Sequence, residues 1–305
     1  MIDYVGCSQR FDQIRLESSF RHSGWTHLRE RVKTSLMLAG ESPNTVERFC
    51  KCGSNAWIMQ SRDNPDRVKL SAFHCKHRLC LQCQHELRRV VAANLLARLD
   101  RRRIRFLTLT LRHANDNSQP DHPSLTDYIN RLYDSFAKLR RTTAWRHHVA
   151  GGVAFLEVKR TSQGWHPHLH ILFDGKYFPQ RELSNLWLRC TGDSYVVDIR
   201  DISGSDGVRY VTKYCTKVSP FMADEELVQM IHALRSRRTF ATFGTWTRWK
   251  LSTPPKTEEV WIYLYPLHQV ILANDRGESW AAQLLARLNQ QPYLLPEGDF
   301  DKPPE

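Results

Sequence analysis

Two short segments of the sequence carry side chains whose types and spacing suit metal-assisted chemistry. The first reads WHPHLHILF and has a histidine at every second position, namely His166, His168 and His170. Alternate side chains of a β-strand point to the same face, so His168 and His170 should project side by side, with His166 behind them. Two imidazoles held in this way form half of a divalent-metal site.

The second segment reads RYVTKYCTK and carries Tyr210 and Tyr214 four residues apart. Residues at this spacing share one face of a helix, so both phenols can reach one target. Each tyrosine is followed three residues later by a lysine, Lys213 or Lys217, whose charge can lower the pKa of the phenol or neutralise charge on a phosphate. Metal-binding histidines and two presented tyrosines predict covalent chemistry on phosphate, with tyrosine as the nucleophile.

A third segment strengthens this interpretation. Taken alone, a His-x-His pair is often a surface feature, and tyrosines four residues apart often form a packing pair. The stretch Phe106–Leu111 alternates apolar residues with threonine and predicts a buried strand ahead of both motifs. Core packing alone rarely produces all three segments in this order.

Two histidines rarely suffice to hold a metal, so a third ligand is expected. Glu157 lies in VAFLEVK, a predicted strand joined by a short turn to the histidine strand, and a cross-strand neighbour can reach the same metal. His166 competes for this place. A surface ion pair of Glu157 with Lys159 or Arg160 is the remaining interpretation, and all three stay open.

Five of the eight cysteines lie between residues 46 and 83. The N-terminus lacks the apolar core of a signal peptide, so we expect a cytoplasmic protein with reduced thiols. Clustered thiolates then suit a tetrahedral structural zinc, for which one of the five is spare. Buried thiols without a metal are the alternative. The five are Cys50, Cys52, Cys75, Cys80 and Cys83.

The order FLTLT, GWHPHLHILF and YVTKYCTK resembles the three motifs of rolling-circle replication initiators, the HUH endonucleases of plasmids and single-stranded phages. The block FHCKHRLCLQC is also similar to the cysteine-rich block that precedes the catalytic domain in the plasmid group. The resemblance covers about residues 50–245. It implies a palm-like core and a polar third ligand beside the two histidines. It also implies zinc ligands at Cys52, Cys75, Cys80 and Cys83, with Cys50 as the substitute.

The resemblance further implies a metal-dependent tyrosine DNA nickase and strand transferase, with Mn²⁺ or Mg²⁺ at the catalytic site and Zn²⁺ in the cysteine module. Tyr214 is implied to be the first nucleophile, leaving a 5′-phosphotyrosine bond and a free 3′ hydroxyl that a polymerase can extend. Many plasmid initiators carry an acidic residue one turn before this tyrosine. Here Tyr210 stands in that place, as in phage-type initiators, which favours two tyrosines exchanging a covalent strand over hydrolytic termination.

The charge balance suits a polyanionic partner. The chain has 44 Lys and Arg against 32 Asp and Glu, a formal net charge of +12. Basic residues concentrate in two runs on either side of the candidate chemistry, and a solvated surface is the alternative to DNA contact. We expect DNA contacts from Arg88, Arg89, Arg101, Arg102, Arg103, Arg237 and Arg238.

Hydrophobic periodicity and breakers predict the elements that position these residues. Helices are expected over about 26–38, 85–100, 124–143, 180–189, 205–217, 221–236 and 279–288. Strands are expected over 104–111, 153–158, 165–173, 195–199, 261–265 and 267–271, with Gly151–Gly152 breaking the chain before one of them. The order predicts an α+β fold, an antiparallel sheet with helices on one face, preceded by a small zinc-binding module.

These elements suggest five regions and a set of partners. The regions are an N-terminal segment of unknown role (1–45), a zinc module with a basic helix (46–100), the nickase core (101–220), a C-terminal region of DNA contact or unknown role (221–289) and a disordered tail (290–305). No apolar run is long enough to span a membrane. Expected partners are single-stranded or supercoiled origin DNA, a host helicase and a DNA polymerase, with a homodimer left open.

Two alternatives to a replication initiator remain at this point. An HUH transposase or a mobilisation relaxase would keep the same chemistry and change its biological setting. A zinc-containing DNA-binding regulator would bind DNA without any catalysis.

Overall fold

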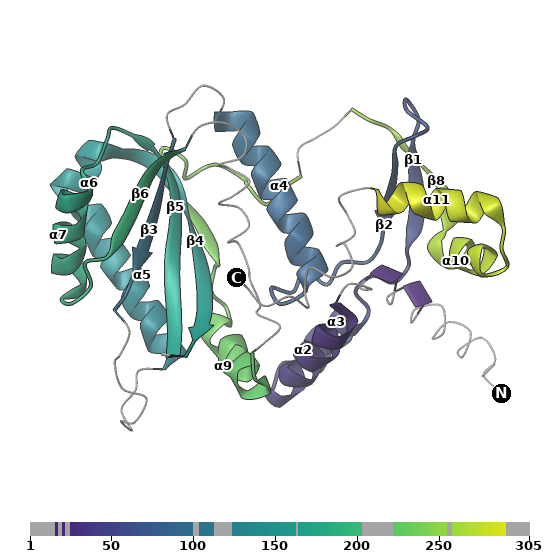
Figure 1. The fold of residues 1–305 in the computed structure, drawn as a ribbon, viewed down its shortest axis with the longest axis horizontal. Coiled ribbons are helices and arrows are strands. Elements are labelled where there is room, and N and C mark those ends of the chain that lie inside the picture. Colours follow the sequence, from purple (N-terminus) through teal and green to yellow (C-terminus); the bar gives the residue numbers. More distant parts are fainter. Residues whose placement is uncertain are drawn as a thin grey trace. The chain divides into compact units, whose positions relative to one another are not determined.

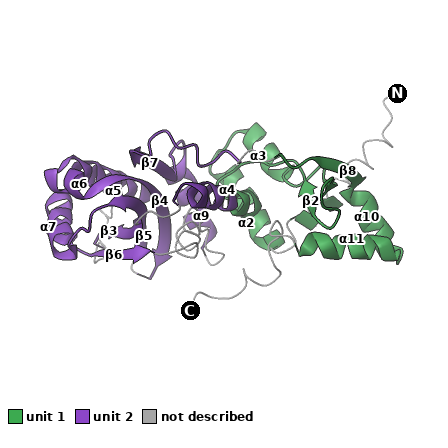
Figure 2. Ribbon diagram, turned by 90° about the horizontal axis from the view of Figure 1, so that it is seen from above, with its two compact units in different colours: residues 1–86, 256–305 green, residues 87–255 purple. Residues whose placement is uncertain are grey.

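The computed structural model describes residues 16–17, 20–21, 25–99, 104–112, 124–162, 164–202, 222–254 and 258–290. The chain divides into two compact units, residues 1–86 with 256–305, and residues 87–255 (Figure 2). The described helices are α2 (Thr26–Leu38), α3 (Pro43–Cys50), α4 (Leu81–Leu99), α5 (Leu125–Arg141), α6 (Thr143–His148), α7 (Gln180–Thr191), α9 (Asp224–Leu234), α10 (Leu267–Asp275) and α11 (Ser279–Asn289). The described strands are β1 (Trp57–Ser61), β2 (Val68–Ser71), β3 (Ile104–Thr110), β4 (Val149–Thr161), β5 (Gly164–Gly175), β6 (Val197–Ile202), β7 (Phe240–Gly244) and β8 (Trp261–Pro266).

An antiparallel sheet forms the centre of the unit 87–255, and its described strands have the order β6-β3-β5-β4-β7 (Figure 1). The long hairpin of β4 and β5 pairs from Gly151 opposite Asp174 to Thr161 opposite Gly164. On its other side, β5 pairs with β3 as far as Thr110 opposite His168. Pro167 therefore lies just beyond the last β3 partner, where the missing N–H of a proline disturbs the sheet least.

Helices cover one face of this sheet. A capping box between Ser124 and Asp127 begins α5, and its residues Ile129, Leu132 and Leu139, at helical spacing, are fully buried. The rings of Phe136 in α5, Trp145 in α6, Phe173 in β5 and Phe243 in β7 pack together, with centroids of neighbouring rings 5.7–6.1 Å apart. This apolar layer holds β5 in place from the side away from the histidines.

The opposite face is covered in part by α4. Its buried side chains Val91, Leu95 and Leu99 pack in one cluster with Phe106 of β3 and Phe155 of β4. The predicted α+β fold with an antiparallel sheet is confirmed, and α4 adds a helix on the second face. Within the described part of the chain, no helix combines the length and apolar character needed to cross a membrane.

Gly151 and Gly152 lie inside β4, so the prediction that they break the chain before this strand is wrong. A Cβ atom at Gly152 would collide with the carbonyl oxygen of Leu172 on β5, and one at Gly151 would collide with Thr245. The glycines let the backbones approach closely, which is the usual reason for glycine within a strand.

The other unit contains a smaller sheet of described strands in the order β2-β1-β8. Ile58, Val68 and Leu70 pack from one face of this sheet against apolar side chains of α10 and α11. The predicted strand over 267–271 is wrong, because these residues begin α10. Their buried positions Leu267, Val270 and Ile271 follow the i, i+3, i+4 spacing of a helix.

Candidate active site and metal centre

The three histidines of β5 lie on one face of the strand. Their neighbouring ring centroids are 4.1 Å apart for His166 and His168, and 5.9 Å apart for His168 and His170. His168 and His170 are only 8% and 5% exposed. The ring of His170 also stacks on Phe106 of β3, with centroids 5.5 Å apart. This side of the sheet is the one on which α4 packs.

Glu157 lies directly opposite His168 in the β4–β5 ladder. Its Oε2 atom is 2.8 Å from Nε2 of His170 and 3.3 Å from Nζ of Lys159. The carboxylate of this pair is buried, whereas the side chain of Lys159 is exposed. Arg160 instead pairs with Glu226 of α9. The sheet thus brings Glu157 and two of the histidines into one cluster.

The electrostatics of this cluster favour the protonation states that bind metals. Burial raises the pKa of Glu157, but the hydrogen bond from His170 and the nearby positive charges outweigh it, so the net pKa is lowered. Burial lowers the pKa of His168 to about 3. Around neutral pH the cluster therefore offers a carboxylate and a neutral imidazole, the forms that coordinate a divalent cation.

Two buried polar atoms of the cluster have no hydrogen-bond partner, Oε1 of Glu157 and Nδ1 of His168. Buried polar atoms are nearly always paired, so such an exception calls for an explanation, and a bound ion is one. Two imidazoles and a carboxylate suit cations such as Mn²⁺. The donor types of these three residues therefore suit a divalent metal, although their ligand atoms do not all lie within 4.8 Å of one another as those of the clustered cysteines do.

Thr108 of β3 is a further residue of this cluster, which the sequence motifs did not single out. It lies opposite His170 in the β3–β5 ladder, with its Oγ1 3.2 Å from Nδ1 of the histidine. A hydrogen bond to one ring nitrogen fixes the orientation of a ligating histidine. The alternation of apolar residues and threonine in FLTLT could have indicated this contact, because it places Thr108 on the face of the sheet that carries the histidines.

The tyrosine segment lies outside the described residues, so Tyr210, Lys213, Tyr214 and Lys217 have no place in the geometry above. The described chain stops at Ile202, the end of β6, and resumes at Met222. Strand β6 pairs with β3, with Thr108 opposite Asp198. The nucleophile assignment therefore remains a prediction from the sequence.

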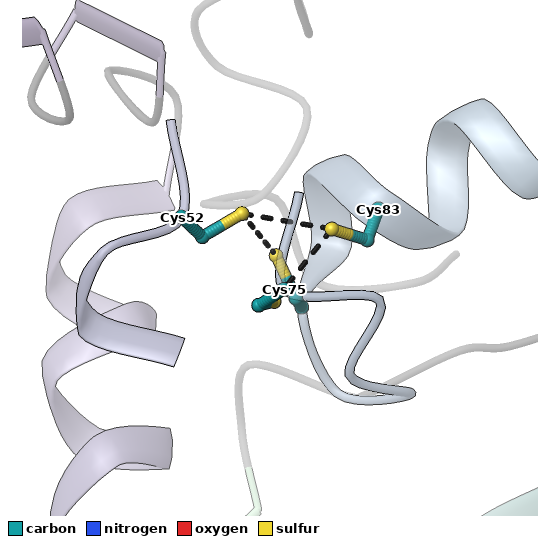
Figure 3. Close-up of side chains that lie close together, drawn as sticks. Cys52, Cys75 and Cys83 are labelled. Atoms are coloured by element: carbon teal, nitrogen blue, oxygen red, sulfur yellow. Dashed lines mark hydrogen bonds between the residues drawn. The ribbon is translucent and has the colours of Figure 1, made fainter. Parts of the chain in front are cut away.

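The cysteine cluster lies in the unit that contains residues 1–86, where four of the five cysteines come together. Cys52 follows α3, Cys75 follows β2, Cys80 directly precedes α4 and Cys83 lies in its first turn. All four side chains are buried, and their sulfurs lie within 4.8 Å of one another. Cys50 is half-buried and is not in this group. Figure 3 shows the sulfurs of Cys52, Cys75 and Cys83 turned toward one another from separate segments.

The distances within this cluster fit a tetrahedral metal. Sγ of Cys83 is 3.6 Å from Sγ of Cys52 and 3.6 Å from that of Cys75, and Cys52 is 3.6 Å from Cys80. Four sulfurs each about 2.3 Å from a zinc ion would be separated by roughly 3.8 Å. Among the described residues, no other group of three or more His, Cys, Asp and Glu side chains has its ligand atoms gathered this tightly. The site could hold one metal ion such as zinc.

The neighbours of the thiols shift their pKa values in opposite directions: hydrogen bonds within the cluster, that with Cys52 first, raise the pKa of Cys75 and of Cys80. Cys52 raises the pKa of Cys83, but hydrogen bonds with Cys75, Cys80 and His74 outweigh this and lower it to about 6. Nδ1 of His74 lies 3.9 Å from Sγ of Cys83, and its Nε2 lies 3.3 Å from Glu86. Thiolate is the form that binds metal.

The predicted DNA-contacting arginines fall in two places. Arg88 and Arg89 lie on α4, whereas Arg101, Arg102 and Arg103 lie outside the described residues. Arg237 and Arg238 lie between α9 and β7 and line a recess of about 340 Å³ together with Arg140 of α5. The guanidinium of Arg140 lies over the rings of Phe136 and Phe243, at 5.6 and 5.0 Å. Sequence analysis did not identify Arg140, because only the fold brings it beside the other two.

Comparison with known proteins gives one finding. The profile of a family described as replication protein matches residues 67–260, more than half of the chain. The matched range includes the whole β4–β5 hairpin and three of the four clustered cysteines, and Cys52 lies before it. Neither curated proteins nor solved structures give a significant match.

Proposed function

The chain belongs to the replication protein family of plasmid rolling-circle initiators, and from this premise we propose that it nicks one strand of origin DNA through a covalent tyrosine intermediate. The observation that carries the proposal is the buried cluster of Glu157, His168 and His170. Its two unpartnered atoms, its neutral imidazole and its carboxylate suit a divalent metal. The resemblance of the three motifs supports the same activity.

In this proposal, Glu157, His168 and His170 hold a divalent metal, Mn²⁺ or Mg²⁺. When bound, the metal would supply Lewis-acid stabilisation of the scissile phosphate. Thr108 and Phe106 hold the ring of His170 from two sides, by a contact at Nδ1 and by stacking. Lys159 contributes positive charge beside Glu157, 3.3 Å from the carboxylate. The rigid hairpin, paired along its length, preorganises these side chains.

The nucleophile in this proposal is Tyr214. Its oxygen forms a bond to phosphorus as the bond to the 3′ oxygen breaks, so the phenol loses one proton and the departing 3′ hydroxyl gains one. The product is a 5′-phosphotyrosine bond and a primer end for a polymerase. Lys217 and Lys213, each three residues after a tyrosine, support the phenolate. Tyr210 takes the strand in a second transfer, which releases the replicated copy.

The remaining parts of the chain support DNA binding in this proposal. The four cysteines hold one zinc ion and brace the unit in which they lie. The basic residues of α4 and those around Arg237 contact DNA phosphates. A host helicase and a DNA polymerase would act on the nicked origin.

The direct test is nicking of a supercoiled plasmid that carries the origin. The protein with Mn²⁺ should convert supercoiled DNA to the open-circular form, with protein bound covalently to the 5′ end. Origin binding without any nick, over a range of divalent metals, would instead identify a DNA-binding regulator. Because the cysteine cluster alone would support binding but no cleavage, a nick also shows that the chain does more than bind DNA.

A further inference from the structure

The three-stranded sheet of the unit 1–86 with 256–305 has one face covered by α10 and α11, and its other face carries aromatic rings. On β1, Trp57 lies opposite Ser71 of β2, and Met59 lies opposite Tyr263 of β8. Trp261 lies opposite Ser61. Because side chains alternate along a strand, Trp57, Tyr263 and Trp261 share the face turned away from Ile58 and its apolar partners. We name these three residues the aromatic face.

The aromatic face is accessible. Tyr263 is 63% exposed, and Trp57 and Trp261 are half-buried. The rings of Trp57 and Tyr263 meet edge to face, with centroids 5.6 Å apart. They border a recess of about 500 Å³ lined by Asn55, Trp57, Ser71, Ala72, Phe73 and Tyr263. Three aromatic rings, an amide and a hydroxyl thus surround one open space.

Such a lining matches the chemistry of a nucleobase. A base has two flat faces that stack on aromatic rings and a polar edge that an amide or a hydroxyl can contact. Duplex DNA hides the faces of its bases, so a stacking surface of this kind favours a single strand. Because stacking does not depend on base identity, the aromatic face would accept different sequences.

Positive charge borders the same face. Nζ of Lys69, on β2, lies 4.0 Å from the ring centroid of Trp261, and the guanidinium of Arg67 lies 5.7 Å from it. Arg67 also pairs with Glu259 at 2.7 Å, which reduces its contribution. Beside the recess, the guanidinium of Arg48 lies 5.3 Å from the ring of Phe73. These cations are placed to meet the phosphates that link stacked bases.

The loops of the cysteine cluster hold one wall of the recess. The N–H of Gly53, next to Cys52, donates to the carbonyl of Phe73 at 2.8 Å, and the N–H of Phe73 donates to the carbonyl of Ser54 at 2.8 Å. Phe73 lies two residues before Cys75. The ring of Phe73 is therefore positioned by the same two segments that bring Cys52 and Cys75 together.

We propose that the aromatic face is a second DNA site, which binds single-stranded DNA by stacking its bases on Trp57 and Tyr263 beside the cations of Lys69 and Arg48. The site goes beyond the nicking function, because it lies in the other unit of the chain and uses none of the residues of the histidine cluster. The three residues of the aromatic face also lie outside the part of the chain that the family profile matches, residues 67–260. Trp57 precedes this range, and Trp261 and Tyr263 follow it. DNA unwound at an origin would supply such a strand.

The test is binding of a fluorescein-labelled oligothymidine to the full-length chain, followed by fluorescence anisotropy. Oligothymidine lacks an origin, so the result does not depend on nicking. Tyr263→Ala and Trp57→Ala should each weaken binding by roughly fivefold or more, the usual effect of removing one stacking ring. Tyr263→Phe, which keeps the ring, should bind like the wild type.

The matched control is Tyr177→Ala, because Tyr177 is 62% exposed and lies in the other unit. It should leave oligothymidine binding unchanged. The melting temperature of each variant, measured by circular dichroism, tests its folding, and the well-exposed Tyr263 decides the question if Trp57→Ala unfolds. Wild-type affinity in Tyr263→Ala would overturn the proposal, as would an equal loss of binding to duplex DNA. All these variants should still nick a short origin oligonucleotide, so failure of the nicking proposal is scored separately.

Discussion

Glu157 and His168 occupy directly opposed positions on β4 and β5, and each keeps one buried polar atom without a hydrogen-bond partner. The pairing follows from the register of a single hairpin, which also puts Phe155 opposite His170. The carboxylate reaches along the sheet to His170 rather than straight across, with Oε2 2.8 Å from Nε2. The carboxylate thus bonds to His170 and lies across the ladder from His168.

The first prediction concerns these histidines. Replacing both His168 and His170 with alanine should abolish nicking of a single-stranded origin, to below about one hundredth of the wild-type rate, because two of the three proposed metal ligands are removed. Binding of the same DNA should be largely unchanged, as measured by gel shift. His147→Ala is the matched control, since His147 is an exposed histidine of α6. Cleavage retained by the double variant with added Mn²⁺ would contradict the metal assignment.

A second prediction decides which residue is the third ligand. Glu157→Gln keeps the size of the side chain and removes its charge, so the affinity for Mn²⁺ should fall by about 10-fold to 100-fold. His166→Ala should have a much smaller effect, because His166 is only half-buried and lies opposite Lys159 rather than beside Glu157. Isothermal titration calorimetry with Mn²⁺ measures both. The reverse order of effects would make His166 the ligand and Glu157 a structural carboxylate.

A third prediction concerns Thr108. If its hydroxyl orients His170, Thr108→Val should lower Mn²⁺ affinity by about 10-fold while preserving the buried shape of the strand. Thr108→Ser, which keeps the hydroxyl, should restore most of the affinity. Equal reductions in both variants would show that the side chain matters only for packing.

The fourth prediction is that the cysteine cluster binds about one zinc per chain, and that this zinc supports folding. Cys83→Ser should lose the zinc and lower the melting temperature. Cys50→Ser should keep both, because Cys50 lies next to the cluster in sequence but outside the group of four. Elemental analysis and thermal melting provide the measurements. Full zinc content in Cys83→Ser, or none in the wild type, would refute the site.

A fifth prediction concerns the basic residues. Binding of origin DNA should weaken steeply with salt, and replacing Arg237 and Arg238 with glutamine should reduce the slope by about 0.7 for each single-strand phosphate that the variant no longer neutralises. The triple replacement of Arg101, Arg102 and Arg103 should act in the same way. An unchanged slope in either variant would assign that group to the solvated surface.

The histidine face could be predicted from the sequence because it depends on a short-range property, the two-residue period of a strand. Glu157 was predicted on the neighbouring strand from the short turn that joins the two strands, whereas Thr108 was not singled out. The contact between Glu157 and His170 could not be predicted, because it depends on the length and direction of a side chain across a finished ladder. The two-residue period does not identify a reaction. The nicking activity and the choice of Tyr214 as nucleophile came from the resemblance to known motifs.

The pairing of strands that are far apart in the chain could not be predicted from the sequence either. Strand β8 pairs with β1 across some two hundred residues, and no local pattern identifies such a partner. The run from Leu267 to Ile271 was mistaken for a strand because five residues are too few for their i, i+3, i+4 spacing to separate a helix from a buried strand. Its helical form is decided by the apolar surface of β1 and β2, against which Leu267 and Val270 pack.

The most direct test of the nicking mechanism is a map of the covalent adduct formed on a labelled single-stranded origin oligonucleotide. Wild-type protein with Mn²⁺ should yield a DNA-linked peptide modified at Tyr214, and Tyr214→Phe should form no initial adduct while it still folds and binds DNA. Tyr210→Phe should form that adduct and fail in the second transfer, which joins the released strand. An adduct found only on Tyr210, or a normal yield in Tyr214→Phe, would contradict the assignment of the nucleophile.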